Sequence, residues 1–125
     1  MIARVGECLR DVEHVVFAYL FGSFAEGRPF ADVDVAVFLA PDAAGVPDTL
    51  AVRLDLMARI ERAIGIAADV VVLNDAPSGL RMAAVRGRLL CSRDDDRRLR
   101  FVESTALQAM DMAVLARESL RALLG

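Results

Sequence analysis

Three short runs of apolar residues place the strongest limit on the fold of this chain. They span residues 14–21 (HVVFAYLF), 32–39 (DVDVAVFL) and 68–73 (ADVVVL), and they are rich in β-branched and aromatic side chains. Such runs are typical of buried β-strands, whereas the segments around them have the three- and four-residue apolar spacing of helices. The order of these segments predicts a single α/β (α+β) domain, residues 1–125, with a small mixed sheet flanked by helices.

Helical segments are expected between and beyond these strands. A first amphipathic helix spans residues 2–12, and a second spans 48–64 with Asp48 as its N-cap. A short helix at 77–85 precedes a brief edge strand at 88–91. The second helix is expected to turn a regularly spaced apolar set to the core: Leu50, Leu54, Met57, Ile60 and Ile64.

The last segment predicts one long helix over residues 94–124, because no Pro or Gly interrupts it before Gly125. A second apolar set on this helix, Leu107, Met110 and Val114, lies off its main stripe. Two interpretations stay open. The wide apolar surface packs on the domain's own core, or the distal turns, residues 114–124, dock on a helical partner or a second copy of the chain. The main stripe alternates spacings of three and four: Leu99, Val102, Ala106, Ala109, Ala113, Ala116, Leu120 and Leu123.

The basic residues of this chain are all Arg, and the absence of Lys excludes several kinds of chemistry. A Walker A phosphate loop needs a Lys, and so do a lysyl-nucleotide intermediate and a Schiff base. The single histidine, His14, excludes a multi-histidine metal site and is assigned a structural role near the start of its strand. Cys8 and Cys91 are expected to be buried free thiols.

Charge and hydropathy patterning limit the partners and the location. A net charge of −3 disfavours a general nucleic-acid coat or a binder of anionic membranes. No apolar run approaches the ~18 residues of a membrane span. Residues 1–10 lack the basic start and apolar stretch of a signal peptide. We therefore expect a cytoplasmic protein with no membrane association and no direct contact with nucleic acid.

Three aspartates carry the candidate chemistry. Asp32 and Asp34 alternate with valines at the start of one strand, so both carboxylates are expected on the same face. Two such carboxylates repel one another unless a cation lies between them, and hard oxygen ligands suit Mg²⁺ or Mn²⁺. Asp69 begins another apolar strand. If the two strands are neighbours, the three acids form the ligand set of a two-metal phosphoryl-transfer site.

A Gly-Ser pair forms the complementary half of the candidate site. Gly22 and Ser23 end the first strand. Glycine permits close backbone approach, while free N–H groups and the hydroxyl offer donors to phosphate oxygens. A phosphate clamp joined by a short loop to a metal-binding acid pair indicates nucleoside triphosphate chemistry. Three arginines further along the chain are interpreted as surface residues: Arg81, Arg86 and Arg88.

The segment FGSFAEGRPFADVDVAVF resembles the signature of the minimal (MNT-type) nucleotidyltransferases of the DNA polymerase β superfamily. In that family a Gly-Ser pair, a short loop with a Gly and an Asp-x-Asp follow one another. A third acid lies on a later strand, which ADVVVLND matches through Asp69. The segment GLRMAAVRGRLLCSRD also resembles the family's continuation, so the likeness covers roughly residues 12–100. The chain departs from the common pattern at Glu26, where Arg is frequent, and at Ala31, where Ser is frequent.

The resemblance implies transfer of AMP from ATP, dependent on Mg²⁺ (or Mn²⁺), with release of pyrophosphate. Gly22 and Ser23 would hold the triphosphate, and Asp32 and Asp34 would bind both metals. Asp69 would complete one metal site and help to activate the acceptor hydroxyl.

Many MNT-type proteins are antitoxins that adenylylate a tyrosine of a helical HEPN toxin. A chain of 125 residues, with no second domain to hold an acceptor, suits that role. Two alternatives stay open. One is a small-molecule nucleotidyltransferase of the antibiotic-modifying type, and the other is a non-catalytic module that neutralises its partner by contact alone.

Overall fold

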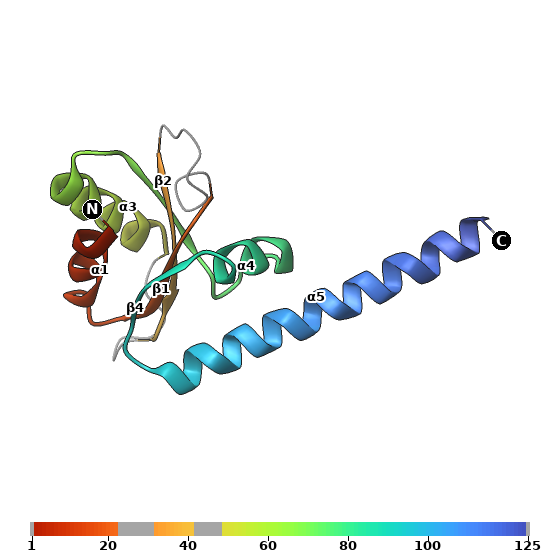
Figure 1. The fold of residues 1–125 in the computed structure, drawn as a ribbon. Helices are drawn as coiled ribbons and strands as arrows, with labels where there is room; N and C mark the ends of the chain where they lie inside the picture. Colours follow the sequence, from red (N-terminus) through yellow and green to blue (C-terminus); the bar gives the residue numbers. More distant parts are fainter. Residues whose placement is uncertain (1, 23–31, 42–48, 125) are drawn as a thin grey trace.

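The structure, a computed structural model, describes residues 2–22, 32–41 and 49–124 (Figure 1). Each predicted strand and helix is present, with its described ends shifted by two residues or fewer. None of the helices in these ranges is long and apolar enough to cross a membrane. In chain order the elements are α1 (Ile2–Arg10), β1 (Val15–Phe21), β2 (Val33–Leu39), α3 (Thr49–Ile64), β3 (Ala68–Val72), α4 (Ser78–Val85), β4 (Arg88–Ser92) and α5 (Asp95–Leu124).

The strands form one four-stranded mixed sheet in the order β3-β2-β1-β4. β1 is antiparallel to both β2 and β4, whereas β2 and β3 run parallel. A parallel pair needs a crossover connection, which α3 supplies between β2 and β3. The predicted mixed sheet is therefore confirmed, and so is the position of β4 at an edge. β3 forms the other edge.

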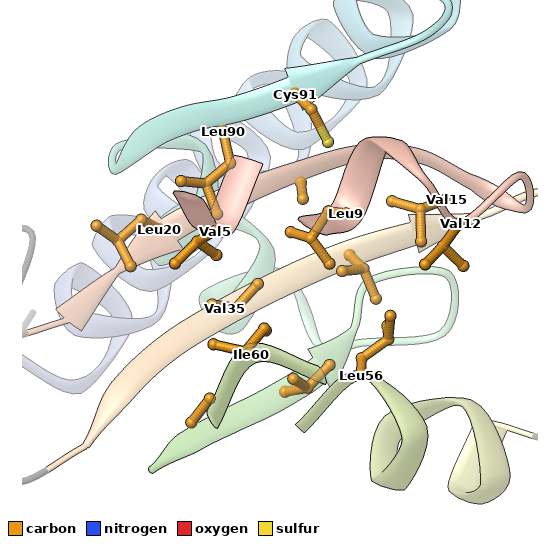
Figure 2. Packing of buried hydrophobic residues seen from close by; sticks show 14 of the residues in the cluster. Val5, Leu9, Val12, Val15, Leu20, Val35, Leu56, Ile60, Leu90 and Cys91 are labelled. Carbon is orange, nitrogen blue, oxygen red and sulfur yellow. The ribbon is translucent and has the colours of Figure 1, made fainter. Parts of the chain in front are cut away.

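Helices cover both faces of the sheet (Figure 1). α1 and α3 lie on one face, where their apolar side chains pack against the strands. Figure 2 shows Leu9 of α1 and Leu56 and Ile60 of α3 in one cluster with Leu20 and Val35 of the sheet. All five side chains are fully buried, and truncating a buried leucine or isoleucine to alanine typically costs about 2–5 kcal/mol. This face supplies the larger part of the core.

An aromatic cluster holds the opposite face. The rings of Phe17 and Phe38 stack with their centroids 5.0 Å apart, and Phe101 of α5 lies 5.4 Å from each of them. Arg97 lies over the Phe38 ring and Arg81 over the Phe101 ring, at 5.2 and 5.1 Å from the ring centroids. Such contacts add roughly 0.5–2 kcal/mol each. The cluster fixes the first turns of α5 on the sheet.

The buried face of α3 differs from the predicted one. Leu50 and Leu54 are 60% and 56% exposed, so their assignment to the core is wrong. Met57, Ile60 and Ile64 pack on the core as predicted, together with Val52 and Leu56, which the predicted set left out. Four of the packed residues form a row of four-residue spacing, which is inclined to the helix axis. Its members are Val52, Leu56, Ile60 and Ile64. Asp48, the predicted N-cap, lies outside the described residues.

The buried residues of α5 all lie in its first half. Phe101 and Thr105 are buried, whereas every described residue from Met110 onward is exposed. Leu99, which begins the predicted stripe, is 53% exposed, whereas Val102 of the same stripe packs against the aromatic cluster. A helix of 30 residues is about 45 Å long, roughly twice the length of a seven-residue strand, so the sheet cannot cover it. The interpretation in which the wide apolar surface packs on the domain's own core is therefore wrong for the distal half.

Two further side chains differ from their predicted environments. Cys91 is a buried free thiol as predicted, and burial raises its pKa. Cys8 is also free but only half-buried. Arg81, expected at the surface, is half-buried, and its guanidinium donates to the carbonyl oxygen of Asn74. A long cationic side chain is stable here because the aromatic ring of Phe101 and the carbonyl oxygen both attract it.

One side chain closes the parallel β2–β3 pair beyond its last strand residue. Asn74 accepts a hydrogen bond from the Leu39 amide at 2.9 Å and donates one to the Leu39 carbonyl oxygen at 2.7 Å. The Leu73 amide adds a bond to the Val37 carbonyl oxygen at 2.8 Å. These bonds continue the ladder past β3 and hold the register of the two strands.

Gly87 is predicted to resist substitution, because it lies against the backbone of β1. A Cβ atom added there would lie 2.0 Å from the Leu20 carbonyl oxygen. We expect Gly87→Ala to lower the free energy of unfolding by about 1–3 kcal/mol, as overpacking does. Gly79→Ala is the matched control, since its Cβ would meet nothing within 4 Å and alanine favours the helix. Urea denaturation measures both variants, and equal stability would contradict the prediction.

Candidate active site

Asp34 and Asp69 lie side by side at one end of the sheet, with Asp32 nearby. The parallel register of β2 and β3 pairs Asp34 directly with Asp69. β1 runs antiparallel to β2 and ends here, so Phe21 is paired with Asp34. Asp32 lies just before β2 and is exposed. The acidic strands are therefore neighbours, which was the condition for the predicted carboxylates to converge.

Asp34 is the half-buried member of this acidic cluster, which consists of Asp32, Asp34 and Asp69. Burial raises the pKa of the Asp34 carboxyl group, and the negative charges of Asp69 and Asp32 raise it further. The carboxylate is thus held where desolvation and its neighbours both oppose its charge. A divalent cation at this end of the sheet would offset both effects.

Gly22 follows β1 directly and lies against Asp34. Its φ is +76°, and a Cβ atom there would lie 2.3 Å from Oδ2 of Asp34. Glycine is required for two reasons, the left-handed backbone and the space that the carboxylate occupies. The sequence accounts for a glycine at position 22 only by the close approach of a phosphate. The structure adds a second reason, because the Asp34 carboxylate also lies against it. Ser23, with Glu26 and Ala31, lies outside the described residues.

One residue at this site was missed by the sequence analysis. Arg53 of α3 reaches the edge of β3, where its Nε donates to the Val70 carbonyl oxygen at 2.7 Å. Its Nη2 lies 3.9 Å from Oδ1 of Asp69. In the sequence, Arg53 is one of several arginines on a helix, and nothing distinguishes it from a solvated surface charge. Only the crossover path of α3 brings it to the acidic cluster.

The acidic cluster has the donor chemistry of a magnesium site in an open geometry. Within residues 2–22, 32–41 and 49–124, no three carboxylate, thiolate or imidazole groups are close enough together to enclose a metal ion. Mg²⁺ in nucleotide sites is typically held by one or two carboxylates together with phosphate oxygens of the substrate. The pairing of Asp34 with Asp69, with Asp32 nearby, fits such a site, because the nucleotide would supply the remaining ligands.

The chain matches the polymerase beta nucleotidyltransferase family over residues 4–96. The match includes all the strands of the sheet and the whole acidic cluster, and it ends at the start of α5. No curated protein matches the chain significantly.

Solved structures with the same fold come from toxin–antitoxin pairs. A chain of a toxin–antitoxin with AMP-PNP has a TM-score of 0.74 and 23% identity, over 99% of this chain and 98% of that chain. A chain of the toxin–antitoxin MntA-HepT has a TM-score of 0.69 and 22% identity, over 99% and 97%. A third, from tri-AMPylated Shewanella oneidensis HEPN toxin in complex with MNT antitoxin, has a TM-score of 0.68 and 23% identity, over the full length of both.

These likenesses extend beyond the sheet to the long C-terminal helix, since they cover nearly the whole of each chain. The family match adds the region that contains the acidic cluster. Sequence, site geometry and fold therefore lead to the same conclusion: this chain belongs to the polymerase β-type nucleotidyltransferase family and shares the fold of the MNT antitoxins of HEPN toxin–antitoxin pairs.

Proposed function

We propose that this protein transfers AMP from ATP to a tyrosine hydroxyl of a cognate HEPN-type toxin, using Mg²⁺ (or Mn²⁺), and so acts as its antitoxin. The observation that carries the proposal is the direct pairing of Asp34 with Asp69, with Asp32 close by, in a nucleotidyltransferase-family chain. Relatives of the same fold support the choice of nucleotide and acceptor. One of their structures contains AMP-PNP, and another contains a tri-AMPylated HEPN toxin.

Each site residue has a role in the proposed reaction. Gly22 and Ser23 hold the triphosphate through backbone N–H groups and the Ser hydroxyl. Asp32 and Asp34 hold the metal ions, which when bound neutralise charge on the phosphate oxygens. Asp69 completes one metal site and accepts the proton of the acceptor hydroxyl. The acceptor oxygen bonds to the α-phosphorus, the bond from that phosphorus to the bridging oxygen breaks, and pyrophosphate leaves.

The acceptor is proposed to come from another protein that docks on α5. The distal half of α5 is a surface rich in large apolar side chains, which is typical of an interface with another protein. Docking of the toxin on residues 114–124 would bring its tyrosine to the acidic cluster, so that binding energy supplies the proximity that the reaction needs. The large apolar side chains that are at least half exposed on this surface are Met110, Met112, Val114, Leu115, Leu120, Leu123 and Leu124.

Asp34→Asn keeps the size of the side chain but removes a charged ligand. We expect it to slow AMP transfer to the toxin by about 10²–10³-fold, the usual loss for a group that stabilises the reacting charges. The melting temperature should stay equal or rise, because burial and neighbouring charges oppose the native carboxylate. Mass spectrometry of the added AMP over time measures the rate.

The control for this variant is Asp55→Asn, which removes an exposed carboxylate of α3 that pairs with Arg59. It should transfer AMP at the wild-type rate. Undiminished AMP transfer by Asp34→Asn would contradict the assignment of Asp34 as a metal ligand. Loss of transfer with full neutralisation of the toxin would instead favour an antitoxin that acts by contact.

Gly22 and Gly65 form a matched pair, because both have positive φ, +76° and +71°. Alanine at either position should cost about 1–2 kcal/mol of stability for the left-handed backbone. Only at Gly22 would the new Cβ collide with Asp34, whereas at Gly65 it would meet nothing within 4 Å. We therefore expect Gly22→Ala to weaken binding of Mn²⁺ and AMP-PNP, measured by calorimetry, while Gly65→Ala binds as wild type. Equal binding by both variants would place the nucleotide elsewhere.

Truncation after Arg117 tests the docking role of α5. The removed residues are exposed over their described part, so the shortened protein should keep its fold and its affinity for Mn²⁺ and AMP-PNP. It should lose the toxin in size-exclusion chromatography and lose AMP transfer to it. A truncated protein that still binds the toxin, or that unfolds, contradicts this part of the proposal. A change from dimer to monomer with toxin binding intact would identify a second copy of the chain as the occupant.

A further inference from the structure

A side chain of α3 forms a hydrogen bond with the outer edge of β3. β3 has a strand neighbour on one side only, so its outward carbonyl groups need other partners. Arg53 supplies one, since its Nε donates to the Val70 carbonyl oxygen at 2.7 Å. This bond anchors the guanidinium beside the strand that carries Asp69. The rest of the guanidinium remains available for a second contact.

That second contact is with the third acid of the cluster. Nη2 of Arg53 lies 3.9 Å from Oδ1 of Asp69. Among the described residues, Arg53 is the only cation that forms an ion pair with Asp32, Asp34 or Asp69. The side chains of this pair are 40% and 53% exposed. An ion pair that is so exposed contributes little stability, so a bound metal ion can displace it.

We propose that Arg53 is a positioning residue that guides Asp69 between two partners. Without metal, its guanidinium holds the Asp69 carboxylate at the edge of β3 and offsets part of the negative charge of the acidic cluster. When the metal–nucleotide complex binds, Asp69 exchanges the guanidinium for the metal, while the bond to Val70 keeps Arg53 in place. This inference rests on the proposed function, because it requires a metal ion at the acidic cluster.

Removal of the cation should therefore have two opposite effects. Arg53→Gln leaves the acidic cluster more negative and frees Asp69 from its competitor, so Mn²⁺ should bind about two- to fivefold more tightly. The same variant leaves Asp69 without its guide, so kcat for AMP transfer should fall about ten- to hundredfold, with a small change in the KM for ATP. A purely structural role would weaken both properties together.

The test measures Mn²⁺ alone, by the electron paramagnetic resonance signal of the free ion, and then kcat and KM with ATP and the toxin. Arg53→Lys keeps the charge but not the planar fork, so its Mn²⁺ affinity should match wild type while kcat falls only in part. Arg59→Gln is the matched control, because Arg59 lies on the same helix and pairs with Asp55 away from the site. It should match wild type in both measurements. Thermal unfolding shows whether each variant is folded.

Unchanged or weaker Mn²⁺ binding by Arg53→Gln, or an unchanged kcat, overturns the inference about Arg53. The proposed function still stands in that case, provided that the wild-type protein transfers AMP. The same holds if Arg59→Gln gives the changes expected of Arg53→Gln, since the effect would then be one of net charge. A wild-type protein that neither binds Mn²⁺ nor transfers AMP overturns the proposed function and the role of Arg53 together.

Discussion

The parallel pairing of β2 with β3 is the constraint on which the site depends. It sets Asp34 beside Asp69 in register, at the end of the sheet where β1 finishes against them. Burial and the like charges of Asp69 and Asp32 both raise the pKa of the Asp34 carboxyl group, so the charged form of this arrangement has a cost in free energy. The apolar residues that continue each strand into the core offset it, and the Asn74 bonds to Leu39 hold the register at the other end. The fold thus maintains an arrangement of negative charges that a divalent cation would relieve.

The two faces of the sheet differ in composition and in what they support. The face covered by α1 and α3 is aliphatic and forms the larger part of the buried core. The other face holds a smaller aromatic cluster, which is just large enough to anchor the first turns of α5. Beyond that cluster α5 leaves the domain, as Figure 1 shows in blue. The same helix can therefore be structural at one end and a contact surface at the other, because burial is set by how far the sheet extends.

α3 links the fold to the chemistry. As the crossover of the β2–β3 pair it packs against β3, and this position places Arg53 where it contacts both the strand backbone and Asp69. A single arginine thus donates a hydrogen bond to an edge strand and forms an ion pair with one acid of the acidic cluster. Gly22, at the end of β1, also contributes to the site, because the absence of a side chain leaves room for the Asp34 carboxylate.

The sequence by itself determined the elements, their order, the mixed sheet and the three aspartates, because alternation, β-branched runs and helical spacing depend on local chain geometry. It also singled out Gly22, although for only one of the two reasons that the structure gives. Tertiary structure alone decided which helical faces are buried, as Leu54 and Leu99 show, because several phases of an apolar helix look equally good until its neighbours are fixed. It alone decided the place of Arg53, whose partners lie on a strand that comes many residues later. Local pattern specifies what a segment becomes, whereas contacts between distant segments depend on where each element stops and what lies beside it.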